Sequence, residues 1–284
     1  MCLHGFPDHA GTWRHLLPML AAAGFRAAAP WMRGIPPTEV PEARRYDPEL
    51  LTADVNALHR ALGGDRRAVV IGHDWGAIGA ARAAAAAPER WRRVVTLAVP
   101  PERALAGAWR DGRQVVRSWY TLAAQVPGLG ERWVTDPDRL ERLWRAWSPG
   151  YEPTVEDIAP LHALVGDPHV RRAMLATYRG TGTAMLRGRA VGVRVAVPPQ
   201  PHLVLHGEDD RCIDVAYARA AADLLRHPAS RVTVVPGTGH WAHLEAPEVV
   251  GAAIVGFVRE DGAAGGGPAR SASAGPQGPG AMPH

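Results

Sequence analysis

The sequence predicts an α/β fold, in which a mostly parallel β-sheet is wound with helices and interrupted by an inserted helical cap. Over residues 1–102, short apolar runs typical of buried strands alternate with helical patterns. Residues 103–187 are helical in pattern, rich in Trp and Arg, and without a convincing strand. The alternation of strand and helix then resumes, and it favours a parallel sheet because each helix carries the chain back to the same edge.

The first part of the predicted core covers residues 1–102. Gly24, the pair Gly63-Gly64 and Pro88 mark breaks between its elements, because glycine and proline end helices. The expected strands are Phe25–Ala29, Ala68–Ile71 and Val94–Leu97, and the expected helices are Leu16–Leu20, Pro48–Leu62 and Ala77–Ala87.

The second part of the core covers residues 188–260. Its expected strands are Pro201–His206 and Val232–Val235, and its expected helices are Val215–Leu225 and Pro247–Val258. Residues 261–284 consist mainly of Gly, Ala, Pro and Ser, with almost no apolar bulk. Such a segment cannot offset the entropy lost on ordering, so we expect a disordered tail there.

Composition excludes several classes of function. All 32 basic residues are arginine, so no lysine amine can form a Schiff base with a carbonyl group or with pyridoxal phosphate. The arginines are scattered among acids rather than gathered with aromatics, and no nucleic-acid partner is expected. Cys2 and Cys212 are too few for a disulfide framework. No apolar run approaches the ~20 residues of a membrane span, and no signal peptide is visible, so we expect a cytoplasmic protein.

The most informative segment spans residues 71–77, Ile-Gly-His-Asp-Trp-Gly-Ala, in which a strand runs into a helix through a sharp turn. Glycines two positions before and after Asp74 leave room for strained backbone, so this side chain is lifted above the sheet. A carboxylate is already ionised at neutral pH and can displace at a saturated carbon, giving an alkyl ester. Asp74 is therefore the candidate nucleophile, and an ordinary helix-capping aspartate is the alternative.

Three further motifs accompany this turn. His-Gly-Phe-Pro occupies residues 4–7, Gly-Glu-Asp-Asp at residues 207–210 follows a predicted strand, and Gly-Thr-Gly-His-Trp at residues 237–241 follows the last one. Nucleophile, acid and histidine thus occur in the chain order of a hydrolase triad built on a strand–turn–helix. From His4 to about Val258 the sequence resembles the α/β-hydrolase superfamily, and within it the branch of epoxide hydrolases and haloalkane dehalogenases.

The resemblance implies an α/β-hydrolase fold and a role for each motif. Asp74 would be the nucleophile and His240 the general base that activates water. The family pattern Gly-Glu-x-Asp makes Asp210 the acid that orients His240, with Asp209 and Asp214 as alternatives.

Further site residues follow from the same resemblance. An oxyanion would accept hydrogen bonds from the backbone N–H groups of Phe6 and Trp75. Neither a metal nor an organic cofactor is expected: His243 follows His240 by three residues, but the His-Glu-x-x-His helix of a zinc enzyme is absent. The expected substrate pocket is lined by His4, Phe6, Trp75, Trp119 and Trp241.

The cap distinguishes the two substrate classes of the branch. Opening an epoxide creates an alkoxide that needs a proton donor, whereas a halide needs only weak N–H donors such as indoles. Tyr120 precedes a Gln-x-Pro-Gly sequence and Tyr178 precedes an Arg, and both positions resemble the lid tyrosines of epoxide hydrolases. Position 6 is Phe rather than Asn, which speaks against a dehalogenase. The sequence therefore favours hydrolysis of a small hydrophobic epoxide to a vicinal diol, with haloalkane dehalogenation as the alternative.

Members of this branch carry two strands and most of a third before the His-Gly-x-Pro motif, whereas three residues precede it here. A strand needs about five residues, so the sheet is expected to lack its N-terminal strands. An exposed sheet edge favours aggregation. A second alternative is therefore an inactive or ligand-binding paralogue.

Overall fold

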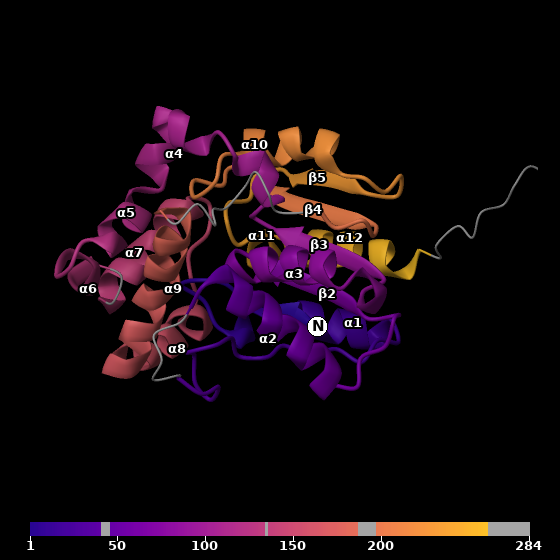
Figure 1. Cartoon of the computed structure of the whole chain (residues 1–284), viewed down its shortest axis with the longest axis horizontal. Coiled ribbons are helices and arrows are strands. Elements are labelled where there is room, and N and C mark those ends of the chain that lie inside the picture. The colour runs from indigo at the N-terminus through magenta and orange to yellow at the C-terminus, as the bar shows by residue number, and fades with distance from the viewer. Residues whose placement is uncertain (41–45, 134–135, 187–196, 261–284) are drawn as a thin grey trace, which may run out of the picture.

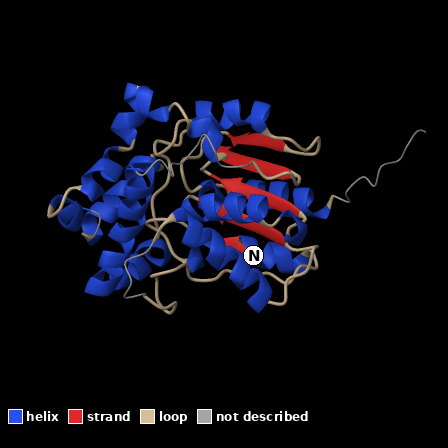
Figure 2. Cartoon of the chain, viewed as in Figure 1, coloured by secondary structure: helices blue, strands red, loops and turns tan. Residues whose placement is uncertain are grey.

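The computed structural model describes residues 1–40, 46–133, 136–186 and 197–260, and it has the predicted α/β fold. The strands of these residues form one parallel sheet whose spatial order follows the chain (Figures 1 and 2). The strands are β1 (Cys2–Leu3), β2 (Val69–His73), β3 (Arg93–Leu97), β4 (His202–Gly207) and β5 (Arg231–Val235). The tail expected to be disordered, residues 261–284, lies outside the described residues.

Both faces of the sheet are covered by helices. Successive side chains of a strand point to opposite faces. On one face Ile71 and Val95 pack against α1 (Leu16–Ala22) and α12 (Pro247–Arg259). On the other face Val70 and Val94 pack against α2 (Pro48–Ala61) and α3 (Trp75–Ala86). Because both faces are buried, the strands are continuous apolar runs rather than alternating ones.

The helices of the core lie close to their predicted ranges, with two differences. Helix α3 begins at Trp75, directly after Asp74, which is two residues before the expected start at Ala77. The expected helix Val215–Leu225 is divided into α10 (Val215–Ala220) and the 3-10 helix η5 (Ala221–Leu224). The remaining short helices are η1 (Ala10–Trp13), η2 (Pro88–Arg90), η3 (Glu102–Leu105), η4 (Ala108–Arg110) and α11 (Ala242–Glu245).

One predicted strand was wrong. Residues 25–29 are not a strand of the sheet, although the backbone N–H of Cys2 donates to the carbonyl of Ala28 at 2.8 Å. The neighbouring strand β1 is only two residues long, and this single hydrogen bond to it does not make a ladder. A hollow of about 650 Å³ lies beside it, at the amino ends of β1 and β2, with Met1 and Val69 in its lining.

In the described residues between β3 and β4, six α-helices lie at the carboxyl edge of the sheet, on the left of Figure 1. The limits predicted for a cap, residues 103–187, stay a prediction, and residue 187 lies outside the described residues. Within the described part of the chain, no helix combines the length and apolarity needed to cross a bilayer. The six helices are α4 (Gly112–Arg117), α5 (Trp119–Gln125), α6 (Leu129–Trp133), α7 (Pro137–Trp147), α8 (Val155–Gly166) and α9 (Pro168–Leu186).

Trp144 of α7 joins these six helices, here called the helical layer, to the core that contains the sheet. The side chain is only 1% exposed, and its indole N–H donates to the carbonyl of Pro7 at 2.7 Å. Its ring stacks on that of Trp241 with centroids 3.9 Å apart. Pro7 and Trp241 both belong to motifs at the carboxyl edge, so this contact fixes the helical layer above the site described below.

Trp144→Ala is expected to destabilise the protein by about 3–5 kcal/mol, because it leaves a cavity and an unpaired Pro7 carbonyl. Denaturant unfolding measures the change in free energy. Trp109→Ala is the matched control, since Trp109 is 66% exposed and its removal is expected to change stability little. Equal effects of the two substitutions would contradict this account of the interface.

Candidate active site

The turn after β2 holds Asp74 in an unusual backbone conformation. Asp74 has φ 51° and ψ −119°, in a region that non-glycine residues rarely occupy. The turn is tight enough that a Cβ on Gly72 would lie 2.1 Å from the carbonyl oxygen of Gly76, and one on Gly76 would lie 2.2 Å from that of Leu3. The two glycines therefore permit the close approach that strained residues at functional sites require.

The carboxylate of Asp74 contacts both flanking motifs. Its Oδ1 accepts a hydrogen bond from the backbone N–H of Phe6 at 2.8 Å. Its Oδ2 lies 3.6 Å from Nε2 of His240, within ion-pair range. The side chain is 10% exposed, so both contacts are made largely away from water.

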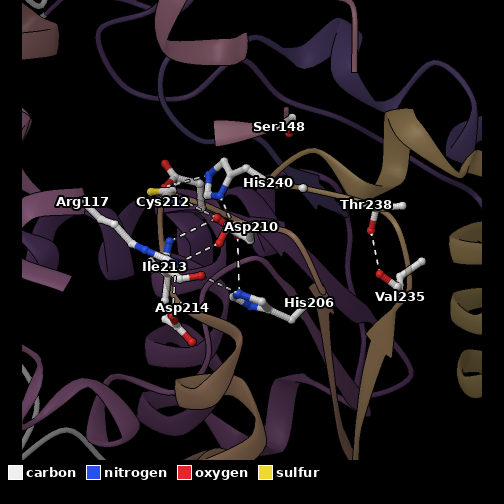
Figure 3. Close-up of polar contacts among 12 residues, drawn as sticks. Arg117, Ser148, His206, Asp210, Cys212, Ile213, Asp214, Val235, Thr238 and His240 are labelled. Atoms are coloured by element: carbon white, nitrogen blue, oxygen red, sulfur yellow. Dashed lines mark hydrogen bonds and ion pairs between the residues drawn. The ribbon is translucent and has the colours of Figure 1, made fainter. Parts of the chain in front are cut away.

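Asp210 is the acid that the structure brings to His240. Its Oδ2 lies 2.9 Å from Nδ1 of His240, and its Oδ1 accepts from the backbone N–H groups of Cys212 at 2.7 Å and Ile213 at 3.1 Å (Figure 3). The alternatives are placed elsewhere: Asp209 is exposed, and Asp214 caps α10. Three hydrogen bonds thus orient a buried carboxylate toward His240.

The charges of this cluster control its protonation. Burial alone would lower the pKa of His240, but Asp210 and Asp74 outweigh burial and raise it to about 10. Burial would raise the pKa of Asp210, but His240 outweighs it and lowers that pKa below its usual range. At neutral pH His240 is therefore an imidazolium beside the carboxylate of Asp210.

Two tyrosines from the helical layer face this cluster. Tyr120 of α5 and Tyr178 of α9 are buried, with ring centroids 5.8 Å apart and planes perpendicular. Tyr178 also contacts the rings of Phe6 at 5.1 Å and Trp75 at 5.4 Å. Burial and then nearby negative groups, Asp74 among them, raise the pKa of both phenols well above the ordinary value. Both tyrosines therefore keep their protons at neutral pH.

Three of the five residues predicted to form the pocket line a common cavity. His4, Phe6 and Trp75 surround a cavity of about 60 Å³ that also meets the apolar side chains of Met32, Ile35 and Met174. Trp119 and Trp241 are not among its lining residues. Trp241 is completely buried and stacks on Trp144, so in this structure it packs the site from behind.

A buried polar layer behind His240 was missed by sequence reasoning. His73 lies 3.3 Å from Asp8 through Nδ1 and 3.0 Å from the carbonyl of His240 through Nε2. His243 lies 2.7 Å from the hydroxyl of Thr12. His73 lies within the 71–77 segment and Asp8 directly follows the His-Gly-Phe-Pro motif, but nothing in their spacing along the sequence shows that the two side chains meet. Possible metal-ligand atoms of Asp8, His73 and His243 lie within 4.8 Å of one another, and the bonds to His240 and Thr12 use only Nε2 of the two imidazoles.

Comparison with known proteins identifies the family. A model described as the alpha/beta hydrolase fold matches residues 1–247. The chain is also 30% identical to Epoxide hydrolase A of Mycobacterium tuberculosis, over 90% of this chain and 88% of that protein. The chain belongs to the α/β-hydrolase fold family. The resemblance read from the motifs is thereby confirmed, and the protein is a hydrolase.

Solved structures agree with this assignment. Epoxide hydrolase A from Mycobacterium thermoresistibile is 27% identical to this hydrolase, with a TM-score of 0.69 over 91% of this chain and 90% of the other. A haloalkane dehalogenase loop variant from Bradyrhizobium elkanii has a TM-score of 0.67 over 90% and 87% of the two chains. The dehalogenase is only 20% identical, and its likeness shows the fold alone.

The raised pKa of His240 makes the stability of the hydrolase depend on pH. A pKa raised from 6.5 to about 10 on folding adds stability that is complete below pH 6.5 and lost as the pH rises through 10. His240→Gln removes this titration, so the Tm difference between wild type and variant is expected to shrink between about pH 6 and pH 10. Thermal melting across this range measures it, with His15→Gln at an exposed histidine as control. A difference that stays constant with pH would contradict the raised pKa.

Proposed function

We propose that this hydrolase opens epoxides with water, through an alkyl ester on Asp74, and releases vicinal diols. One observation carries the proposal: Asp74 in the strained turn lies 3.6 Å from His240, which Asp210 orients, and the charge of Asp74 acts on the phenols of the two buried tyrosines. A carboxylate nucleophile, a base and paired acids are what epoxide hydrolysis needs. The relative from Mycobacterium tuberculosis, named an epoxide hydrolase, supports the same substrate class.

In the first step an oxygen of Asp74 bonds to one oxirane carbon, and the bond from that carbon to the ring oxygen breaks. The ring oxygen takes a proton from Tyr120 or Tyr178, leaving a phenolate. Both phenols are suited to this because they remain protonated in the free enzyme. An alkoxide that forms in a buried site without such donors would be costly.

Ester formation then changes the charge around His240. The negative charge of Asp74, which helps to raise the pKa of His240, disappears when the carboxylate becomes an ester. The pKa of His240 therefore falls, and its proton can restore the phenol. A neutral imidazole, still oriented by Asp210, is now available as a base. The site thus produces its base at the step that needs it.

In the second step His240 takes a proton from water, and the hydroxide adds to the ester carbonyl carbon. The resulting oxyanion accepts hydrogen bonds from the backbone N–H of Phe6, which already reaches Asp74, and from that of Trp75 at the start of α3. Breaking the ester bond gives the diol, which takes its proton from His240. The carboxyl group returns its proton to His240, and the starting charges are restored.

His240→Gln is expected to stop the reaction at the ester, because ring opening does not require the base. Intact-mass measurement after incubation with an epoxide panel should show one added substrate mass, located on Asp74. Asp74→Asn is expected to show no adduct. Asp210→Asn should slow ester hydrolysis by about 10²–10⁴-fold, with the exposed neighbour Asp209→Asn as the matched control.

The same panel includes chloroalkanes, and adducts with chloroalkanes alone would replace the epoxide assignment with dehalogenation. No adduct with either class would favour the inactive or ligand-binding alternative.

Tyr120→Phe and Tyr178→Phe are each expected to slow ring opening by about 10²-fold, because each removes a proton donor to the ring oxygen. Rapid-quench measurement of the rate of ester formation tests this. Tyr217→Phe is the matched control, since the Tyr217 hydroxyl donates to Asp111 at 3.0 Å, away from the candidate site. Wild-type rates in both lid variants would exclude the tyrosines as proton donors.

A further inference from the structure

The phenol of Tyr120 has a partner that the proposed mechanism does not use. Its oxygen lies 3.3 Å from Sγ of Cys212, and either atom can be the donor. Tyr120 lies on α5 of the helical layer, whereas Cys212 lies two residues after Asp210 in the loop that follows β4. Cys212 is 1% exposed and Tyr120 is 7% exposed, so water does not compete strongly for the contact.

The backbone of Cys212 is held from two sides. Its N–H donates to Oδ1 of Asp210 at 2.7 Å, and its carbonyl accepts from the side-chain amide of Gln114, on α4, at 2.8 Å. The sulfur position is thus tied both to the acid of the candidate triad and to the helical layer. A rigid partner of this kind limits the positions open to the Tyr120 phenol.

Both groups of this contact, the thiol of Cys212 and the phenol of Tyr120, carry a proton at neutral pH. Burial raises the pKa of the Cys212 thiol well above the ordinary value, and the nearby carboxylates of Asp210 and Asp74 add to the effect. Burial likewise raises the pKa of Tyr120. Only one of the two protons can lie between sulfur and oxygen. Because a thiol can be donor or acceptor, the contact survives when the phenol turns its own proton elsewhere.

We propose that Cys212 is a positioning residue for Tyr120, which fixes the phenol oxygen and becomes its donor when the phenol proton turns to the oxirane oxygen. This inference rests on the proposed function. With the S–H of Cys212 directed at the phenol, the proton of Tyr120 is free to face substrate. After proton transfer the same S–H stabilises the phenolate. Cys212 forms no covalent bond in this scheme.

A positioning role of this kind affects only one chemical step. Ring opening uses a phenol proton, which Tyr120 supplies in this scheme, whereas hydrolysis of the ester uses His240 and the backbone donors of the turn. Loss of the Cys212 side chain should therefore slow ester formation and leave ester hydrolysis unchanged. A general loss of packing would alter both steps or lower the Tm.

Single-turnover rapid quench, with mass measurement of the ester on Asp74, gives the two rates separately. Cys212→Ala is expected to slow ester formation by about 3- to 10-fold, the range for one weak hydrogen bond. Cys212→Ser, which keeps a donor, should recover part of the loss. Cys2→Ala is the matched control, because it removes an equally buried thiol from β1. All reactions contain a chelator, so that a metal ion cannot bind at Asp210, Cys212 and His240, whose possible ligand atoms lie within 4.8 Å of one another.

A double-mutant cycle completes the test. In a Tyr120→Phe background, Cys212→Ala should have no further effect on ester formation, because the phenol on which it acts is gone. An unchanged rate in Cys212→Ala, an equal slowing of both steps, or a full additional loss in the Tyr120→Phe background would each overturn the inference. If Cys212→Ala fails to fold, Cys212→Ser replaces it in the cycle. If Cys212→Ser slows ester formation equally in the wild-type and Tyr120→Phe backgrounds, the inference is overturned. If wild type forms no ester from any epoxide, the proposed function itself fails.

Discussion

The imidazole of His240 lies between two carboxylates, 2.9 Å from Asp210 and 3.6 Å from Asp74, and all three groups are buried. Burying one unpaired charge here would cost several kcal/mol, and the pairing of His240 with its two acidic neighbours reduces that cost. Any chemistry that neutralises Asp74 therefore changes the proton affinity of His240. This coupling gives the proposed reaction its order, since the base forms only after the nucleophile has been used.

The fold brings these charges together through the parallel direction of its strands. Asp74 follows β2, Asp210 lies in the loop after β4 and His240 follows β5, so all three reach the carboxyl edge of one sheet. Residues far apart in the chain can thus meet without a long loop. The layer of Asp8 and His73 behind the histidine then fixes its backbone through the bond to the His240 carbonyl. A site that needs ångström-level placement is supported on rigid elements rather than on loops alone.

The sequence predicts those parts of the site whose structure is determined by residues close together in the chain. The Gly72–Gly76 spacing predicts the turn because the steric need for glycine lies within five residues. Only the family resemblance assigned the acid to Asp210 rather than Asp209. The two neighbouring side chains have the same chemistry, and the sequence does not show which of them points toward His240. Residues 25–29 have the composition of a strand, but strand formation depends on repeated hydrogen bonds to a partner, and the bond from Cys2 to Ala28 alone does not provide them. The contact of Cys212 with Tyr120 joins residues 92 positions apart, and no sequence pattern records it.

The two lid tyrosines look equivalent in sequence, but their surroundings differ in kind. Tyr178 is enclosed by the rings of Phe6 and Trp75, which position it through edge-to-face packing. Tyr120 is instead joined to the acid loop through sulfur, and its ring also packs on Trp147 at 4.9 Å. A side-chain hydrogen bond with Trp75 also acts on the phenol of Tyr178 and opposes the rise in pKa that burial causes, whereas the partner of the Tyr120 phenol is the thiol of Cys212. Each phenol thus has a partner able to donate to its oxygen, the indole N–H of Trp75 at Tyr178 and the thiol of Cys212 at Tyr120, so either phenolate could be stabilised after proton transfer.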